Sequence, residues 1–484
     1  MIRSTRSVLT VSASEAIVKG LADDGGLFIF DNFDFFAFDE SLLRLSYADL
    51  AKKVLSACFS DIAYSDIERI IDGAYSSKNF DVPVALSRFG KDSYLELWHG
   101  PTCAFKDMAL TVLSGLIDVS KKNIGDDGDT LILTATSGDT GGATLSGFLS
   151  GKVNEVVLYP NGGVSPIKEA QMRYFARNGS AAIAVEGNFD DCQSLVKRVF
   201  ADKNFSHSCE LASANSINIG RLVPQIVYYM YSYLELVRQR KIKFGEETVF
   251  SVPTGNFGDI FAGYVAKRFG VPIAKLICAS NANDVLTEFL SSGVYDRRRP
   301  FYKTISPSMD ILVSSNLERL LYVLSDNDCA TCASYMKSLS ESGRYEVSDK
   351  IKNGLKDFYP FRADDGETAK EIARVFDKDG YLIDPHTAVA SAALKDYREK
   401  TGYVGEGVVV STASPYKFPI PVAEALGVKA DEDVFKTLDI IERFTSNPAP
   451  DSLKKLKGFS FLRESWGKDE AEDRLKDLIV NYKV

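Results

Sequence analysis

One lysine lies at the junction between a run of turn residues and an apolar helical pattern. Lys106 follows a stretch that contains Gly100 and Pro101, and the helical pattern begins directly after it at Asp107. A partly desolvated lysine in such a place can lose its proton near neutral pH and condense with an aldehyde as a Schiff base. The alternative, an exposed lysine at a helix start, is the commoner case for a lone lysine. Other segments must therefore decide between the two.

A turn with two glycines separates a strand-like run, residues 248–253, from a helical run, residues 260–268. Such glycines let backbone amides converge on an anion at the helix N-terminus, where the helix dipole also favours negative charge. The turn lacks the Gly-Lys-Ser/Thr of nucleotide P-loops and the three spaced glycines of dinucleotide sites. Taken alone, it is more often a tight connection. If the turn is a binding site, it is a cradle for a phosphate group, and Asp259 caps the helix that follows. The cradle consists of Gly255, Asn256, Phe257, Gly258 and Asp259.

A second loop combines glycines with small hydroxyl residues after another strand-like run, residues 131–135. Hydroxyl and backbone donors at a helix start can hold a carboxylate or a phosphate of a substrate. The alternative is a well-capped helix, and the two do not exclude each other. We expect Ser137 or Asp139 to be the cap. The loop consists of Thr136, Ser137, Gly138, Asp139 and Thr140. With the phosphate cradle, it favours Lys106 as the lysine that binds pyridoxal phosphate.

Strand-like runs alternate with helical stretches from residue 94 onward, which is typical of βα units stacked around mostly parallel sheets. Ligands bind such sheets beyond the carboxyl ends of the strands, and all three segments lie there. We predict an α/β fold with two subdomains over residues 94–484, a helical insertion at about 284–379, and a small, mainly helical N-terminal domain over residues 1–93. Residues 451–484 are amphipathic and predict a helix. The strand-like runs are residues 131–135, 155–159, 181–185, 248–252, 273–279 and 407–411.

The composition is that of an ordinary globular enzyme. A length of 484 residues is enough for two or three domains. Hydrophobic residues make up 45% of the chain and charged residues 25%. The formal net charge of -9 argues against a nucleic-acid surface. No apolar run approaches the roughly 20 residues that span a bilayer, and a secretory signal is poorly supported. We therefore expect neither a nucleic-acid nor a membrane partner.

Cysteine and histidine are too sparse to build a metal site. Seven cysteines, an odd number, indicate reduced thiols rather than a disulfide framework. The only close pair is Cys329 with Cys332, which we expect to be small apolar residues of a helix. With only three histidines, far apart in the sequence, no metal is predicted.

At these loops the sequence resembles the threonine synthases, a family of fold-type II pyridoxal-phosphate enzymes, in their longer fungal and bacterial class. Cys103 stands where that family usually has an aliphatic residue. Ser414 stands where a histidine is expected, which weakens any acid/base or phosphate role there. The resemblance begins at about residue 4, so we expect a cytoplasmic protein without a transit peptide. Further similar blocks are residues 20–27, 214–221, 306–320, 384–388 and 411–419.

The resemblance implies pyridoxal 5'-phosphate as cofactor and O-phospho-L-homoserine as substrate, which loses phosphate and gains water to give L-threonine. Lys106 would carry the cofactor and then act as general base. Thr412 would bind the pyridine nitrogen, Asp139 would lie near the ring hydroxyl, and residues 136–140 would hold the substrate carboxylate. The candidates for the substrate phosphate are Arg221 with Asn215 and Ser216, and more weakly Lys417.

Several alternatives stay open at this point. Without the resemblance, Thr412 could equally be an ordinary strand threonine, and Arg221 and Lys417 could be surface ion-pair residues. The nearest rival function is a phospholyase or a threonine/serine dehydratase of the same fold type. A second rival is a non-catalytic paralogue that keeps the scaffold for binding or regulation. We expect a monomer or homodimer.

Overall fold

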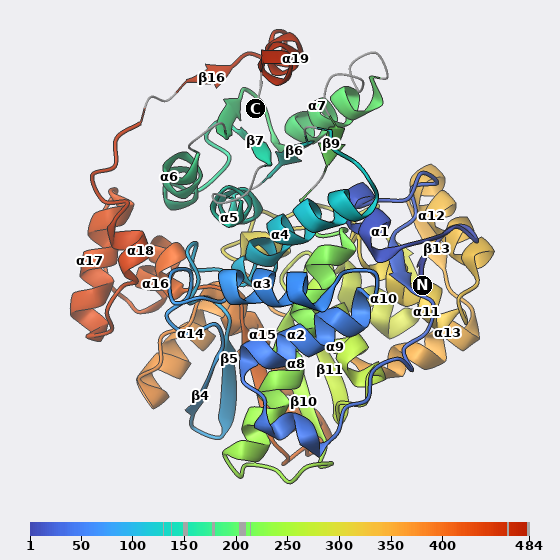
Figure 1. The fold of residues 1–484 in the computed structure, drawn as a ribbon. Coiled ribbons are helices and arrows are strands. Elements are labelled where there is room, and N and C mark those ends of the chain that lie inside the picture. Colours follow the sequence, from blue (N-terminus) through green and yellow to red (C-terminus); the bar gives the residue numbers. More distant parts are fainter. Residues whose placement is uncertain are drawn as a thin grey trace.

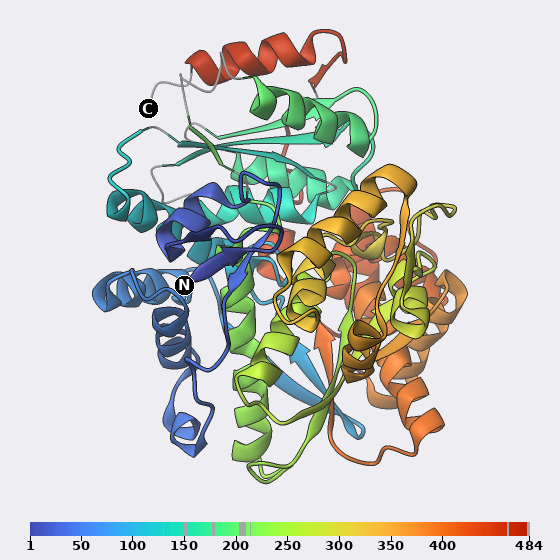
Figure 2. The same cartoon turned by 90° about the vertical axis from the view of Figure 1, so that its right-hand side faces the viewer.

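The computed structural model describes residues 1–128, 130–136, 138–148, 153–176, 180–202, 210–212, 214–461 and 464–481. Two α/β units make up most of this part of the chain, each around its own sheet, with the smaller unit above the larger in Figure 2. All six strand-like runs predicted from the sequence form strands. The alternation of strand and helix therefore predicted the architecture correctly.

The larger sheet has the strand order β14-β11-β10-β15-β5-β4 and is parallel except for the antiparallel pair of β4 with β5. Its strands are β4 (Ala85–Phe89), β5 (Asp92–Glu96), β10 (Thr248–Pro253), β11 (Ile273–Ser280), β14 (Phe358–Arg362) and β15 (Gly407–Ser411). Apolar side chains of alternate strand residues face opposite helix layers, as a doubly covered sheet requires. One layer contains α8 (Ile219–Arg238), α9 (Gly258–Arg268) and α10 (Val285–Ser292), and the other contains α14 (Asp365–Asp379) and α15 (Pro385–Thr401).

The smaller sheet is parallel throughout, with the order β16-β8-β7-β6-β9. Its strands are β6 (Thr130–Ala135), β7 (Asn154–Pro160), β8 (Ala181–Val185), β9 (Glu210–Ala212) and β16 (Ser465–Trp466). One face packs on α5 (Asp139–Gly147) and α6 (Pro166–Phe175), the other on α7 (Phe189–Ala201) and α19 (Ala471–Asn481). Helix α4 (Asp107–Asn123) lies between the two units (Figure 1) and packs against both α5 and α8. Lys106 directly precedes α4, at its N-cap position.

The N-terminal region combines helices with a small antiparallel sheet. Its elements are β1 (Ile2–Ser4), β2 (Thr10–Val11), α1 (Ala13–Lys19), β3 (Phe28–Phe30), η1 (Glu40–Arg44), α2 (Tyr47–Cys58) and α3 (Tyr64–Ala74). Their buried apolar side chains join the same core cluster as those of α4, α8 and α9. The range 1–93 also includes β4, which belongs to the larger sheet. The N-terminal region is therefore packed directly onto α4, α8 and α9.

The range 284–379 joins β11 to α15 and supplies the edge strand β14 as well as helices. Besides α10, β14 and α14, it contains β12 (Val294–Asp296), η2 (Pro307–Met309), α11 (Leu317–Leu324), α12 (Cys329–Ser342), β13 (Arg344–Glu346), α13 (Asp349–Gly354) and η3 (Leu355–Asp357). Cys329 and Cys332 lie on α12, as predicted. The described residues hold no cluster of three or more potential metal ligands.

The C-terminal region does not form the one helix that its pattern predicts. It consists of η4 (Pro415–Lys417), α16 (Pro419–Ala425), α17 (Val434–Thr445), α18 (Asp451–Lys454), β16 and α19. Gly458, with a φ of 78°, breaks the pattern, and the strand β16 adds to the edge of the smaller sheet. Within residues 451–484, the prediction holds for α18 and α19 but not for β16. Of the helices in the described ranges, none is both long and apolar enough to cross a membrane.

Candidate active site

Lys106 is held between the end of β5 and the first turn of α4. The backbone N–H of Phe105 donates to the carbonyl of Thr412 at 2.8 Å, and Ala104 forms a β-bridge with Ala413. These contacts fix the lysine beside the carboxyl end of β15. Its side chain is 15% exposed, so the alternative of a solvated lysine is wrong. Burial lowers the pKa of Lys106 to about 8, against the opposing effect of the Asp139 carboxylate.

Asp139, in the first turn of α5, is the carboxylate on which three lysines converge. Lys417 Nζ lies 2.8 Å from Oδ1, Lys168 Nζ lies 3.0 Å from Oδ2, and Lys106 Nζ lies 3.9 Å from Oδ2. Ser308 Oγ also donates to Oδ2 at 2.9 Å. Although burial opposes ionisation, the lysines hold the pKa of Asp139 well below its usual value. The carboxylate is therefore ionised throughout the physiological range.

Arg221 is a further buried cation, and it acts on Lys106. Its side chain is 3% exposed, and its charge lowers the pKa of Lys106 further. Nη1 donates to the carbonyl of Ala214 at 2.8 Å, whereas Nε meets no acceptor among the described residues. Burial lowers the pKa of the guanidinium to about 10. Three lysines around Asp139 and a buried arginine with an unused donor that acts on Lys106 make a site for anionic ligands.

The glycine turn after β10 has the form of an anion cradle. Phe257 has a left-handed backbone with a φ of 61°, and the Asn256 carbonyl accepts from Asn316 Nδ2 at 2.8 Å. A Cβ at Gly255 would lie only 2.8 Å from the Ser308 carbonyl oxygen. Across the described ranges, the backbone N–H groups of Asn256, Phe257 and Gly258 meet no protein acceptor. Because the carbonyls are engaged and these donors are not, the turn fits a phosphate group.

Neither aspartate that we expected to cap a helix does so. Asp259 accepts from the hydroxyls of Tyr228 and Tyr229 at 2.6 and 2.7 Å, and α9 has no side-chain cap. Burial raises the pKa of Asp259 to about 6. At α5 it is Thr136 Oγ1 that accepts from Gly138 N and Gly141 N, at 3.0 and 3.1 Å, because the α5 loop folds back over its own hydroxyl.

The remaining predicted residues lie near the glycine turn, at the start of α5 or at the end of β15, except for one outside the described residues. Ser216 Oγ accepts from Asn316 Nδ2 at 3.4 Å, which joins the segment of Asn215 and Ser216 to the glycine turn. Thr140 lies in the first turn of α5, and Thr412 directly follows β15. Ser137 lies outside the described residues.

Lys417 and Ser414 lie on one short segment after β15. Lys417 is 1% exposed, and its amine also donates to the Thr102 carbonyl at 2.8 Å. The surface ion-pair alternative is therefore wrong for Lys417, as it is for the buried Arg221. Ser414 is fully buried, and its Oγ caps η4 by accepting from Tyr416 N.

No role could be predicted from the sequence for three contributors to this site, which are Lys168, Ser308 and His386. Lys168 lies in α6 and looked like any helical lysine. His386 Nε2 accepts from the backbone N–H of Ser308 at 3.1 Å, and its Nδ1 donates to Asp384 at 2.6 Å. His386 thereby holds the segment whose hydroxyl binds Asp139. The blocks at 306–310 and 384–388 drew attention to these residues but assigned them no role.

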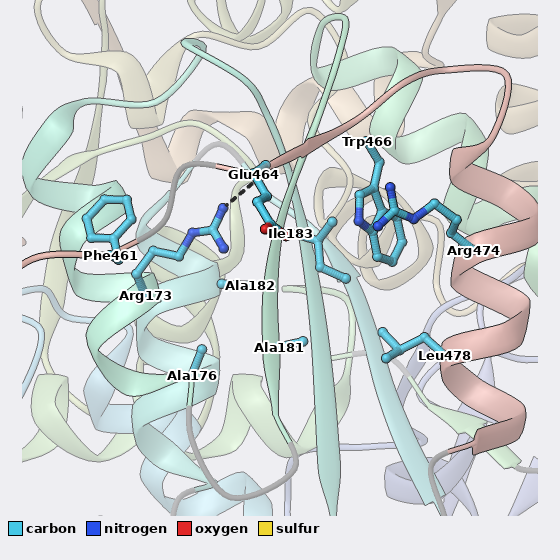
Figure 3. Close-up of a pocket in the computed structure, with 10 residues that line it drawn as sticks. All are labelled: Arg173, Ala176, Ala181, Ala182, Ile183, Phe461, Glu464, Trp466, Arg474 and Leu478. Atoms are coloured by element: carbon cyan, nitrogen blue, oxygen red, sulfur yellow. Dashed lines mark hydrogen bonds between the residues drawn. The ribbon is translucent and has the colours of Figure 1, made fainter.

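A cavity of about 520 Å³ lies elsewhere, beneath β16 in the smaller unit (Figure 3). Arg173 and Phe461 lie on one side of it, and Arg474 stacks over Trp466 on the other. Its remaining lining residues are Ala176, Ala181, Ala182, Ile183, Glu464 and Leu478. None of the residues around Asp139 borders it, so the candidate site is defined by the lysine cluster and the glycine turn.

Comparison with known proteins gives consistent matches along the whole chain. Residues 86–414 match a family model described as pyridoxal-phosphate dependent enzyme, and residues 2–75 match threonine synthase N terminus. The chain is 37% identical to the threonine synthase of Pseudomonas aeruginosa, over 94% of this chain and 96% of that protein. It is 38% identical to threonine synthase-like 1 of Homo sapiens, over 86% of this chain and 58% of that protein. The crystal structure of pyridoxal-phosphate-bound threonine synthase from Brucella melitensis superposes with a TM-score of 0.88, at 37% identity and 99% coverage of both chains.

Proposed function

The chain belongs to the threonine synthase family of pyridoxal-phosphate-dependent enzymes, and we propose that it converts O-phospho-L-homoserine and water to L-threonine and phosphate. Membership confirms the predicted fold type and cofactor. The observation that carries the proposal is the buried Lys106 among excess cations at Asp139, beside a turn with unused backbone donors.

The residues present fit pyridoxal phosphate. The free N–H groups of the glycine turn suit its phosphate, and Lys106 suits its aldehyde. Thr412, next to the lysine in space, offers a hydroxyl to the ring nitrogen. A hydroxyl does not stabilise positive charge on that nitrogen as a carboxylate would. When bound, the cofactor would supply the electron sink for removal of a proton from the substrate.

Lys106 is suited to move the proton at the substrate Cα. A pKa of about 8 leaves a useful fraction of the amine neutral at pH 7 to 8, so it can accept a proton and return it. Asp139 stays ionised and limits the fall in the lysine pKa. Lys168 and Lys417 hold Asp139 in place through Oδ2 and Oδ1. The base is thus both available and oriented.

Arg221 is our candidate for the substrate phosphate, with Asn215 and Ser216 beside it. A guanidinium with a free, buried Nε matches a phosphate oxygen well. Residues 136–140 at the start of α5 would bind the substrate carboxylate, with Lys417 as a weaker candidate for phosphate. This excess of cations favours a phosphorylated substrate over the hydroxy amino acid of a dehydratase.

The test is purified protein with O-phospho-L-homoserine, assayed for phosphate and threonine together. Equal amounts of the two products are expected. Phosphate with a 2-oxo acid would make the protein a phospholyase, and a colourless protein with no product would make it a non-catalytic paralogue.

Two variants connect this assay to the site. Lys106→Ala should lower phosphate release at least about a thousandfold, because both cofactor attachment and proton transfer depend on it. Arg221→Ala should raise KM about tenfold or more. Arg221→Lys keeps the charge, so its KM should lie between those of Arg221→Ala and the wild type. An unchanged KM in Arg221→Ala would remove the arginine from the phosphate site. The cytoplasmic location, the monomer or homodimer state and the domain boundaries stay predictions.

A further inference from the structure

Arg319, in the first turn of α11, is a fully buried arginine that joins three segments far apart in the sequence. Nε donates to the carbonyl of Phe28 in β3 at 2.9 Å. Nη2 donates to the carbonyl of Ile217, and Nη1 donates to Oδ1 of Asn316. No substrate or cofactor role falls to this side chain in the mechanism above. Two of its three acceptors, Asn316 and Ile217, nevertheless lie next to the proposed phosphate sites.

Asn316 carries the connection to the cofactor side. Because Arg319 binds its Oδ1, the amide is oriented with Nδ2 toward the Asn256 carbonyl, 2.8 Å away, and toward Ser216 Oγ, 3.4 Å away. The backbone N–H of Asn316 also donates to the Asn256 carbonyl at 3.0 Å. Two donors on this carbonyl turn the Asn256 to Phe257 peptide so that its N–H points into the cradle.

Ile217 carries the connection to the substrate side. It lies between Ser216 and Asn218, and Asn218 caps α8 by accepting from Gly220 N at 2.8 Å. The same Asn218 donates to the Ile17 carbonyl of α1 at 2.9 Å. The segment before Arg221 is therefore fixed between Arg319 on one side and the N-terminal region on the other.

We infer that Arg319 is a positioning residue that holds the cofactor-phosphate turn and the substrate-phosphate loop at a fixed separation, with β3 of the N-terminal region as the anchor. The identity of the two phosphates rests on the proposed function, but the geometry does not. A change at Arg319 should weaken both ligands together and affect kcat less, because the side chain touches neither Lys106 nor Asp139.

Arg319→Lys is the test variant, since it keeps the buried charge but loses the three-way fork. Arg238→Lys is a matched control. Arg238, at the far end of α8, also donates to three carbonyls of the N-terminal region, those of Leu42, Leu43 and Leu45. Arg238→Lys also loses hydrogen bonds from a guanidinium to backbone carbonyls, but Arg238 contacts neither phosphate loop.

Three quantities are measured for each variant: the dissociation constant of pyridoxal phosphate from the apoprotein by absorbance titration, and KM and kcat for O-phospho-L-homoserine. Arg319→Lys should raise the dissociation constant and KM about tenfold each and lower kcat less than threefold, roughly the effect of losing one hydrogen bond to a charged group. Arg238→Lys should leave all three values within about twofold of the wild type. Equal effects of the two variants on pyridoxal phosphate binding, whether large or absent, would overturn the inference.

Asn316→Asp covers the case in which Arg319→Lys does not fold. It gives Arg319 a counter-charge, so the fold should be retained, but it removes the side-chain donor to the Asn256 carbonyl and leaves only the backbone donor. Cofactor binding should again weaken about tenfold, and wild-type affinity in this variant would also overturn the inference. Since cofactor affinity is measured without substrate, it tests Arg319 even if the wild type made no threonine.

Discussion

The helices α5 and α9 begin alike in sequence and differ in electrostatics. Each follows a parallel strand through a glycine loop, and each opens with a Gly-Asp pair, Gly138-Asp139 and Gly258-Asp259. Asp139 faces three lysines and has a pKa well below its usual value. Asp259 faces two tyrosine hydroxyls, and burial raises its pKa to about 6. The same local signal therefore precedes a carboxylate whose ionisation lysines favour in one unit and a carboxylate whose ionisation burial opposes in the other.

The difference comes from elements that pack on the helices, not from the loops. Lys168 reaches Asp139 from α6 and Lys417 from η4, whereas both tyrosines reach Asp259 from α8. The Asp259 carboxyl accepts hydrogen bonds from both tyrosine hydroxyls, and burial opposes its ionisation. A fully charged carboxylate beside Lys106 keeps the lysine cluster together. Each aspartate fits the anion chemistry of its own loop.

The largest effect on this comparison should come from Asp139→Asn. It leaves Lys168 and Lys417 buried without their counter-charge, which should cost about 3–5 kcal/mol of unfolding free energy. Urea unfolding of the apoprotein measures it, and added phosphate should restore part of the loss. A loss below about 1 kcal/mol would mean that the cluster does not depend on this carboxylate.

Asp259→Asn should raise the free energy of unfolding, whereas Asp139→Asn should lower it. Because the folded pKa of about 6 lies above the usual 3.8, ionisation of Asp259 costs stability as pH rises from 4 to 6. The variant lacks that cost, so it should gain up to about 3 kcal/mol relative to the wild type between pH 4 and pH 7. Unfolding curves of both apoproteins across this range measure the gain. A pH-independent difference would show that the carboxyl has an ordinary pKa.

Tyr229→Phe should give the smallest effect. Its hydroxyl donates to Asp259, and removing it should cost about 1–2 kcal/mol at pH 7, where the carboxylate is charged. In the Asp259→Asn background the cost should shrink, and a double-mutant cycle measures this coupling. If the cost were the same in both backgrounds, the tyrosine would not be acting through Asp259.

The sequence predicted the loops better than the contacts between them. Strand periodicity and glycine position place Thr136, Gly255 and Thr412 at strand ends, because these signals are local. The partners of Asp139 and Asp259 depend on helices that come from other parts of the chain, so both were wrongly predicted as caps. Lys168 has no local signal at all, since a helical lysine is ordinarily solvated. Arg221 was found only because the resemblance pointed to it.

The central claim is that Lys106, and not one of its two buried lysine neighbours, carries the cofactor. Reduction of the purified holoenzyme with borohydride, digestion and peptide mass spectrometry test it most directly, because the reduced linkage is stable. The account predicts the added mass of the cofactor on the peptide that contains Lys106. Added mass on a peptide that contains Lys168 or Lys417 instead would contradict it.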